Sequence, residues 1–172
     1  MRDDPIALAA EHWRSHGWAD AADGMALVTS IMRVQQLLLG RIEAVLRPSG
    51  LTFARYEVLR LLGFTRTGTL PIGKIGERLQ VHASSVTNAV SRLEADGLVA
   101  RSPNPDDGRG VLVTLTDDGR QLVEACTPEL NDVFAALPMP ASGQRQVFAA
   151  LAAVRAAFDD FAAGEPAETV AG

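Results

Sequence analysis

The sequence predicts a mainly α-helical fold with a small β-hairpin, an α+β arrangement. Two observations support this prediction. Apolar residues recur every three or four positions through most of the chain, which is the period of an amphipathic helix. Only between residues 98 and 116 does the period change to two, in β-prone runs on either side of a loop rich in proline and glycine.

The composition limits the class of protein before any motif is considered. The chain has 172 residues, 47% hydrophobic and 22% charged, which suits one globular domain with or without extensions. A single cysteine excludes a disulfide framework within one chain and fits a reducing compartment. Neither a signal peptide nor a run of about 18 apolar residues is evident. We therefore expect a soluble cytoplasmic protein without a membrane partner.

The first 50 residues predict two helices. Residues 1–24 read as an N-terminal extension that contains one short helix. Residues 25–50 read as a long helix whose apolar positions are three or four apart, and Pro48 and Gly50 end it. An apolar stripe of this length has to be buried against a partner, so we expect this helix to form part of a dimer interface.

Residues 51–115 predict a compact lobe. Thr52 has the side chain of an N-cap, and Gly97 suits the position just after a helix. Residues 65–69 read as a loop. The other expected elements, in order, are helices over 51–64, 70–80 and 84–96, and hairpin strands within 98–102 and 110–116.

Residues 116–163 return to the helical period and predict two further dimerisation helices. Asp117 and Asp118 suit the positive end of the first, which Pro128 should kink. The second starts near residue 142 and carries an apolar stripe, namely Val147, Leu151, Val154, Phe158 and Phe161. Packing on their own lobe is the alternative to a dimer for both this stripe and that of the helix over 25–50. Residues 164–172 read as a flexible tail.

The order of two helices, a tight turn, a third helix and a hairpin is that of a winged helix-turn-helix lobe. In such a lobe the helix after the turn lies in the major groove of double-stranded DNA. Side chains with hydroxyl, amide or guanidinium groups line its outer faces and suit contacts to bases and phosphates, namely Ser84, Ser85, Thr87, Asn88, Ser91 and Arg92. An ordinary solvated helix face is the alternative interpretation.

Net charge does not decide between these interpretations. The chain carries a formal charge of −5, but residues 70–115 contain five bases and five acids and are therefore neutral. This balance permits DNA binding without arguing for it. The acidic total also leaves open a second hypothesis, a winged-helix module that binds another protein and not specific DNA.

The stretch from Ser84 to Val123, SSVTNAVSRLEADGLVARSPNPDDGRGVLVTLTDDGRQLV, resembles the winged-helix signature of the MarR family of transcription regulators. The resemblance extends from about Met25 to Phe161. It implies a homodimer in which helices from both chain ends interleave and two winged lobes bind a palindromic site. Members mostly repress, and many release DNA when a small phenolic or carboxylate ligand, or an oxidant, arrives.

The tip of the hairpin matches an Asp-x-Arg element of the family in Asp107 and Arg109. The resemblance implies that Arg109 enters the minor groove, where a narrow groove offers an enhanced negative potential to arginine. Asp107 can brace the guanidinium by a charge-assisted hydrogen bond. A surface ion pair is the alternative. Arg101, on the first hairpin strand, can serve a phosphate or a ligand.

Part of the chain also looks like the urate-responsive branch of the family. The positions that correspond to its ligand residues are Trp13, Glu57 and Arg101, although the branch has aspartate in place of Glu57. An arginine of its recognition helix falls on Ala89, so a different small aromatic or carboxylate effector fits equally well. A packing anchor at Trp13 and a surface carboxylate at Glu57 are the alternatives.

Other chemistry is weakly represented. His12 and His16 share a helix face but have no third ligand nearby, so we expect no metal site. Cys126 lies among apolar residues and is expected to be buried and not a redox sensor. No nucleophile–base pairing and no phosphate-binding glycine loop is evident, so we expect neither an enzyme nor a cofactor.

Overall fold

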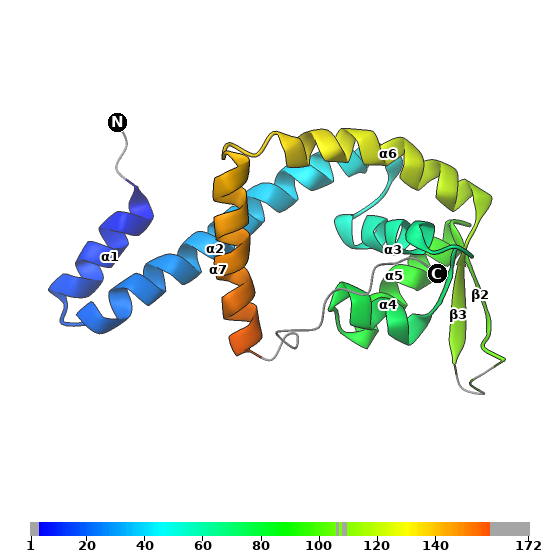
Figure 1. Cartoon of the computed structure of the whole chain (residues 1–172), viewed down its shortest axis with the longest axis horizontal. Helices are drawn as coiled ribbons and strands as arrows, with labels where there is room; N and C mark the ends of the chain where they lie inside the picture. The colour runs from blue at the N-terminus through cyan, green and yellow to red at the C-terminus, as the bar shows by residue number, and fades with distance from the viewer. Residues whose placement is uncertain (1–3, 106, 108–109, 159–172) are drawn as a thin grey trace. The chain divides into compact units, whose positions relative to one another are not determined.

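The computed structural model describes residues 4–105, 107 and 110–158 (Figure 1). Its elements are α1 (Pro5–Ser15), α2 (Ala19–Leu46), the 3-10 turn η1 (Arg47–Ser49), α3 (Phe53–Phe64), β1 (Thr69–Pro71), α4 (Ile72–Leu79), α5 (Ala83–Ala95), β2 (Val99–Pro103), β3 (Val111–Leu115), α6 (Asp117–Ala135) and α7 (Ala141–Ala157). A mostly helical chain with a small antiparallel sheet is the predicted fold class, which is therefore confirmed. The chain divides into two compact units between Ala44 and Val45.

The first unit consists of α1 and most of α2. The Asp4 side chain caps α1 by accepting a hydrogen bond from the Ile6 N–H at 2.9 Å, and Gly17 turns the chain with a φ of +87°. The long helix was predicted from residue 25 but begins at Ala19. It runs through Gly24, because an interior glycine weakens a helix by about 1 kcal/mol without ending it.

The second unit begins at the end of α2, where the predicted helix stop lies. Pro48 falls within η1, and Gly50 adopts the left-handed conformation with a φ of +68°. Thr52 then caps α3 by accepting the Arg55 N–H, as its side chain predicted. α2 and α3 are therefore connected by the three residues of η1 and a short non-helical link.

The core of the second unit lies where α3, α4 and α5 pack together. The helix pairs α3–α4, α3–α5 and α4–α5 are all in contact, and α3 also packs against α6 (Figure 1). The largest side chains in this core are fully buried, namely Leu59, Leu62, Ile75, Val90 and Leu93. Gly97 follows α5 with a φ of +74°, as its position in the sequence predicted.

A three-stranded antiparallel sheet, in the order β1-β3-β2, follows the helices. β2 and β3 form the predicted hairpin, with Arg101 opposite Val113. The sequence missed β1, because Thr69 was read as loop and Leu70 and Pro71 as the start of the next helix, which begins only at Ile72. Three residues are too few to show a period of two. Thr69 pairs with Thr114 in the sheet, and their hydroxyl oxygens lie 2.9 Å apart.

The start of α6 packs closely on the turn between α5 and β2. Thr116 donates its N–H to the Leu98 carbonyl at 3.2 Å and its hydroxyl to the Gly97 carbonyl at 2.9 Å. Its hydroxyl oxygen also accepts the Gly119 N–H, which makes Thr116 the N-cap of α6. A Cβ atom at Gly119 would collide with the Leu98 carbonyl oxygen, so only glycine fits this contact.

The C-terminal helices differ in how they are buried. Pro128 lies inside α6, which continues to Ala135. α7 begins at Ala141, close to the predicted start, and none of its residues is buried. Phe161 and the predicted tail at 164–172 lie outside the described residues. The predicted division of the chain into extension, dimerisation helices, lobe and tail stays a prediction.

Candidate nucleic-acid interface and ligand cavity

The helix α5 has the two faces that the sequence predicted. Val86, Val90 and Leu93 are buried, and Ala89 is half-buried beside them. The other faces carry the six predicted contact residues, of which five are exposed and Ser91 is half-buried, namely Ser84, Ser85, Thr87, Asn88, Ser91 and Arg92. No acidic residue lies in the first turn of α5, so no side chain there opposes an anion at the positive end of the helix dipole.

The hairpin loop is closed by backbone hydrogen bonds. The Asn104 N–H donates to the Gly110 carbonyl at 2.9 Å, and the Gly110 N–H donates to the Asp107 carbonyl at 2.8 Å. β2 and β3 form a two-stranded ribbon beside α4 and α5 (Figure 1), and this loop joins the two strands. Asp107 is part of the loop, whereas Arg109 lies outside the described residues.

Arg101 is paired across the turn between α5 and β2. Its Nη2 lies 2.6 Å from Glu94 Oε2, its Nε donates to the same oxygen at 2.7 Å, and Nη2 also donates to Ser91 Oγ at 3.0 Å. The sequence named Arg101 and Ser91 but missed Glu94. The seven-residue separation of Arg101 and Glu94 crosses a helix end and a turn, so no helical spacing indicates their contact.

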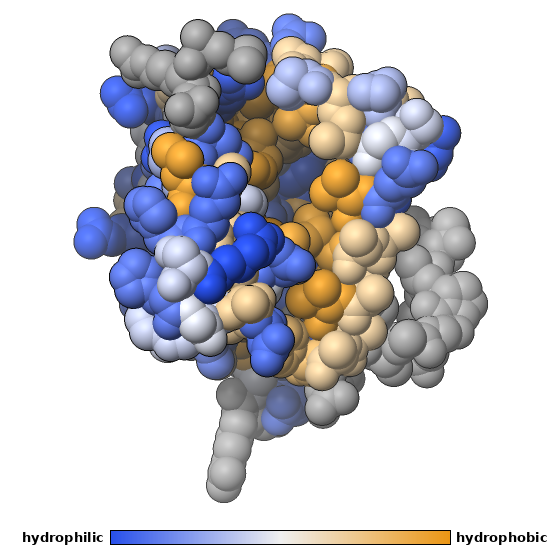
Figure 2. Space-filling model, turned by 90° about the vertical axis from the view of Figure 1, so that its left-hand side faces the viewer, coloured by the Kyte–Doolittle hydropathy of each residue, from blue (hydrophilic) through white to orange (hydrophobic). Residues whose placement is uncertain are grey.

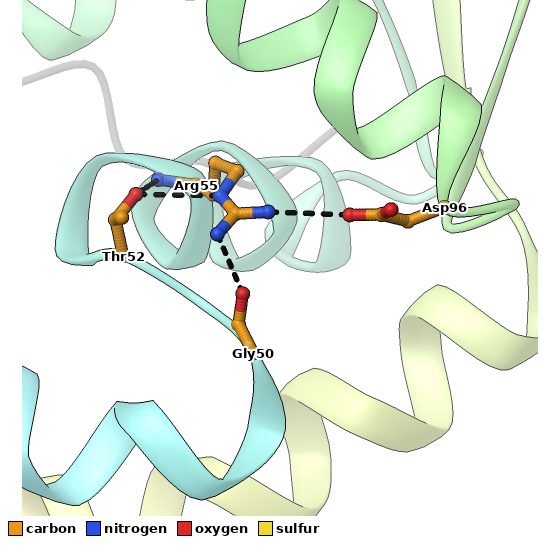
Figure 3. A network of polar contacts seen from close by, with 4 residues as sticks. All are labelled: Gly50, Thr52, Arg55 and Asp96. Atoms are coloured by element: carbon orange, nitrogen blue, oxygen red, sulfur yellow. Dashed lines mark hydrogen bonds and ion pairs between the residues drawn. The ribbon is translucent and has the colours of Figure 1, made fainter.

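Arg55 fastens the end of α5 to the start of α3, and the sequence missed this too. Its guanidinium donates to the Gly50 carbonyl at 2.5 Å and to Asp96 at 3.2 Å (Figure 3). Asp96 is the C-cap of α5, and Thr52 accepts from both the backbone N–H and the Nε of Arg55. The arginine therefore joins three segments that together position α5.

A cavity of about 510 Å³ opens between α3 and α6. Its lining is mainly aromatic and apolar, with one acid and one base, and consists of Phe53, Tyr56, Glu57, Arg60, Leu61, Phe64, Leu79, Thr127, Asn131 and Phe134. Burial raises the pKa of the Glu57 carboxyl above its usual value. Glu57 is half-buried in the lining of this cavity, which differs from the surface carboxylate of the alternative interpretation.

Arg60 supplies the positive charge of this cavity, and the sequence did not single it out. Its guanidinium carbon lies 4.5 Å from the ring centroid of Phe64. Its Nε is buried and has no hydrogen-bond partner within the described part of the chain. Its position three residues after Glu57 on one helix was the available signal.

Two further residues, Arg101 and Trp13, were predicted as ligand residues. Arg101 does not line the cavity, since its guanidinium is held by Glu94. Trp13 belongs to α1 in the first unit, where its ring lies edge-on to Trp18 with centroids 5.3 Å apart. The packing anchor that the sequence offered as an alternative for Trp13 agrees with this contact.

The remaining candidates for chemistry have structural partners. His16 Nδ1 lies 2.8 Å from the His12 carbonyl oxygen, and no cluster of three metal-ligating side chains occurs among the described residues. Cys126 is buried, as predicted, and donates to Ser49 Oγ at 3.1 Å. No helix within the described ranges is long and apolar enough to cross a membrane.

This chain spans about half to three fifths of the length of two curated relatives. The MarR family profile matches residues 49–110. The organic hydroperoxide resistance transcriptional regulator of Bacillus subtilis is 36% identical over 74 residues, which are 43% of this chain and 49% of that protein. The transcriptional repressor IacR of Pseudomonas putida is 30% identical over 104 residues, which are 60% of this chain and 61% of that protein.

Two solved structures share the fold at low sequence identity. Sco3205 of Streptomyces coelicolor, a MarR family regulator solved in complex with DNA, is 23% identical with a TM-score of 0.73, covering 86% of this chain and 91% of its own. BpsR of Bordetella bronchiseptica, whose DNA binding is regulated by 6-hydroxynicotinic acid, is 26% identical with a TM-score of 0.66, covering 74% of this chain and 97% of its own.

A third solved structure is similar over almost its whole length. Sco5413 of Streptomyces coelicolor, a MarR family transcriptional regulator, is 52% identical with a TM-score of 0.72, covering 81% of this chain and 97% of its own. This identity over a complete relative agrees with the helix order, the hairpin and the two faces of α5. The chain belongs to the MarR family of DNA-binding transcription regulators, which are not enzymes.

Proposed function

We propose that the protein is a homodimeric, ligand-responsive repressor that binds a palindromic operator, with α5 in the major groove and the hairpin in the minor groove. The observation that carries this proposal is the polar outer surface of α5, directly followed by the hairpin of β2 and β3. Repression is supported by the kinship with IacR, which is itself a repressor. The whole-protein activity is proposed because the curated relatives are matched over only part of their length.

The dimer is supported by apolar surface that one chain leaves uncovered. α7 has no buried residue, and large apolar side chains are open to solvent along α2 and α7, namely Leu27, Val28, Ile31, Met32, Val34, Leu37, Val147, Phe148, Leu151 and Val154. Figure 2 shows hydrophobic residues open at the molecular surface. Exposed patches of this kind mark interaction sites, and a second copy of the chain is the economical partner.

Binding to DNA upstream of the protein's own gene tests the proposal. A dimer should prefer a pseudo-palindrome whose half-sites lie about 10 base pairs apart, one helical turn. The logarithm of the affinity should fall linearly with the logarithm of the salt concentration, because phosphate contacts release counterions. Equal affinity for unrelated DNA, or no dependence on salt, would contradict the proposal and favour a protein-binding module.

Arg109→Ala should weaken operator binding about tenfold, since one positioned arginine contact contributes about 1–3 kcal/mol. The fold should be unaffected, because the substitution falls between β2 and β3 and alters none of their paired residues. Fluorescence anisotropy measures the affinity, and the thermal unfolding midpoint checks the fold. Arg66→Ala is the matched control, since it removes one exposed positive charge from the loop between α3 and β1. If the two substitutions weakened binding equally, Arg109 would contribute to the affinity only through its charge and not through a specific contact.

We further propose that a small aromatic or carboxylate effector binds the cavity between α3 and α6. Its aromatic walls suit a planar ring, Arg60 suits a carboxylate, and Glu57 suits a ring N–H or hydroxyl donor. The kinship with BpsR, whose DNA binding responds to 6-hydroxynicotinic acid, supports a ligand of this class. The ligand role predicted for Trp13 and Arg101 is not part of this proposal.

Glu57→Gln should raise the thermal unfolding midpoint of the free protein at pH 7. Burial raises the pKa of Glu57 above its ordinary value of 4.5, so the folded state is penalised by the charge wherever the unfolded chain is ionised. The penalty fades as the pH falls through the raised pKa, so the difference from the unaltered protein should vanish near pH 4. Differential scanning fluorimetry across this range measures it.

The same variant tests the effector. 6-Hydroxynicotinic acid should raise the unfolding midpoint of the unaltered protein and raise that of Glu57→Gln less. Glu124→Gln, an exposed position on α6, is the control and should behave as the unaltered protein does. An equal ligand response in all three proteins would place the ligand outside this cavity.

A further inference from the structure

Glu94 lies on the side of α5 that carries the proposed DNA contacts. It follows Ser91 by three positions and Thr87 by seven, which places all three on one helix face. The buried face begins beside it, since Val90 precedes Glu94 by four positions and is fully buried, and Glu94 itself is half-buried. A carboxylate on a surface meant for phosphates is unfavourable by itself, so the partner of this carboxylate matters.

That partner is Arg101, one of the bases proposed to reach DNA. Two of its nitrogens, Nε and Nη2, converge on Glu94 Oε2 at 2.7 and 2.6 Å, and Nη2 also donates to Ser91. A phosphate oxygen would compete for these same donors. The side chains of Arg101 and Glu94 remain 30% and 39% exposed, so the pair is open to an incoming phosphate and is not locked in the core.

We propose that Glu94 restrains DNA binding by occupying Arg101, so that the pair has to open before the guanidinium can contact a phosphate. This inference rests on the proposed DNA-binding function and adds a residue that tunes it. In this proposal, the affinity for DNA is lower than the basic side chains of the second unit would give if Arg101 were unpaired. It also lowers the steepness of the salt dependence, because one base is neutralised within the protein.

Glu94→Gln tests the restraint as a gain of affinity, which a damaged fold cannot produce. Operator binding should tighten about twofold to fivefold, the range set by loss of one exposed ion pair. The slope of log affinity against log salt should become steeper by about 0.9, the value of one added phosphate contact. Asp23→Asn is the matched control: it removes the same charge from the ion pair with Arg14 in the first unit and should change neither quantity.

A double substitution separates the restraint from simple repulsion between Glu94 and DNA. If Arg101 is released to a phosphate, Arg101→Ala should weaken binding, and Glu94→Gln should give no gain when combined with it. A gain that persists in the Arg101→Ala background would overturn the inference, as would unchanged or weaker binding by Glu94→Gln alone. Absence of operator preference in the unaltered protein would instead overturn the proposed function, and the inference with it.

Discussion

Gly119→Ala is expected to destabilise the second unit by about 2–3 kcal/mol, the upper part of the range for overpacked sites. The added Cβ would collide with the Leu98 carbonyl oxygen and would also approach a Leu115 methyl group to 2.9 Å. Leu98 cannot retreat without loss, since its N–H donates to the Leu93 carbonyl at 2.8 Å and its own carbonyl accepts from Thr116. Thermal unfolding should begin about 4–12 °C lower than in the unaltered protein.

Gly73→Ala is the control for this prediction. Gly73 is exposed on α4, in the same unit, and a Cβ there would meet no atom within 4 Å. Its unfolding midpoint should be unchanged or slightly higher, because alanine is the better helix former. An unfolding midpoint of Gly119→Ala equal to that of Gly73→Ala would mean that α6 can shift away from the turn before β2.

Leu151→Glu is expected to separate the proposed dimer into monomers. Leu151 lies in the middle of the apolar stripe of α7, between Val147 and Val154, and all three side chains are exposed in one chain. Burying a carboxylate there would cost several kcal/mol, which an interface of separate helices cannot offset. Operator affinity should fall by about 100-fold or more, because the two DNA-binding lobes would have to bind their half-sites independently. Sedimentation velocity measures the oligomeric state.

Ala149→Glu is the control for the dimer. Residue 149 lies on the opposite side of α7 from residue 151 by helical spacing and is also exposed. It adds the same charge to the same helix and should leave both the oligomeric state and the operator affinity unchanged. If Leu151→Glu stays dimeric while Ala149→Glu also does, α7 is not part of the interface.

Local patterns predicted most of the fold. The three-to-four period located the helices, the threonine at 52 and the glycine at 97 were identified as caps, and the change to a period of two located the hairpin. These features depend on residues within a few positions of one another. The strand β1 was missed because it is defined by its pairing with β3, some 45 residues later in the chain, and not by a local pattern.

Features that depend on tertiary contacts were beyond the sequence. The polar face of α5 was predicted residue by residue, yet nothing in the spacing indicated that Arg101 would turn back onto Glu94. The Glu57 position was found through the family resemblance, but the cavity that Glu57 lines together with Arg60 is formed by residues of α3, α4 and α6, which one sequence does not bring together. Side-chain partners across a turn or between helices are set by packing, which one sequence does not reveal.

The contacts of Arg55 have a consequence for exchanging parts between relatives. Its guanidinium bridges a carbonyl before α3 and a carboxylate after α5, positions 46 residues apart in the chain, counted from Gly50 to Asp96. A transplant of α5 alone into another scaffold would leave the Asp96 end without its arginine. The smallest module that carries its own anchoring is therefore the segment 50–96, and grafts of operator specificity should be cut at those limits.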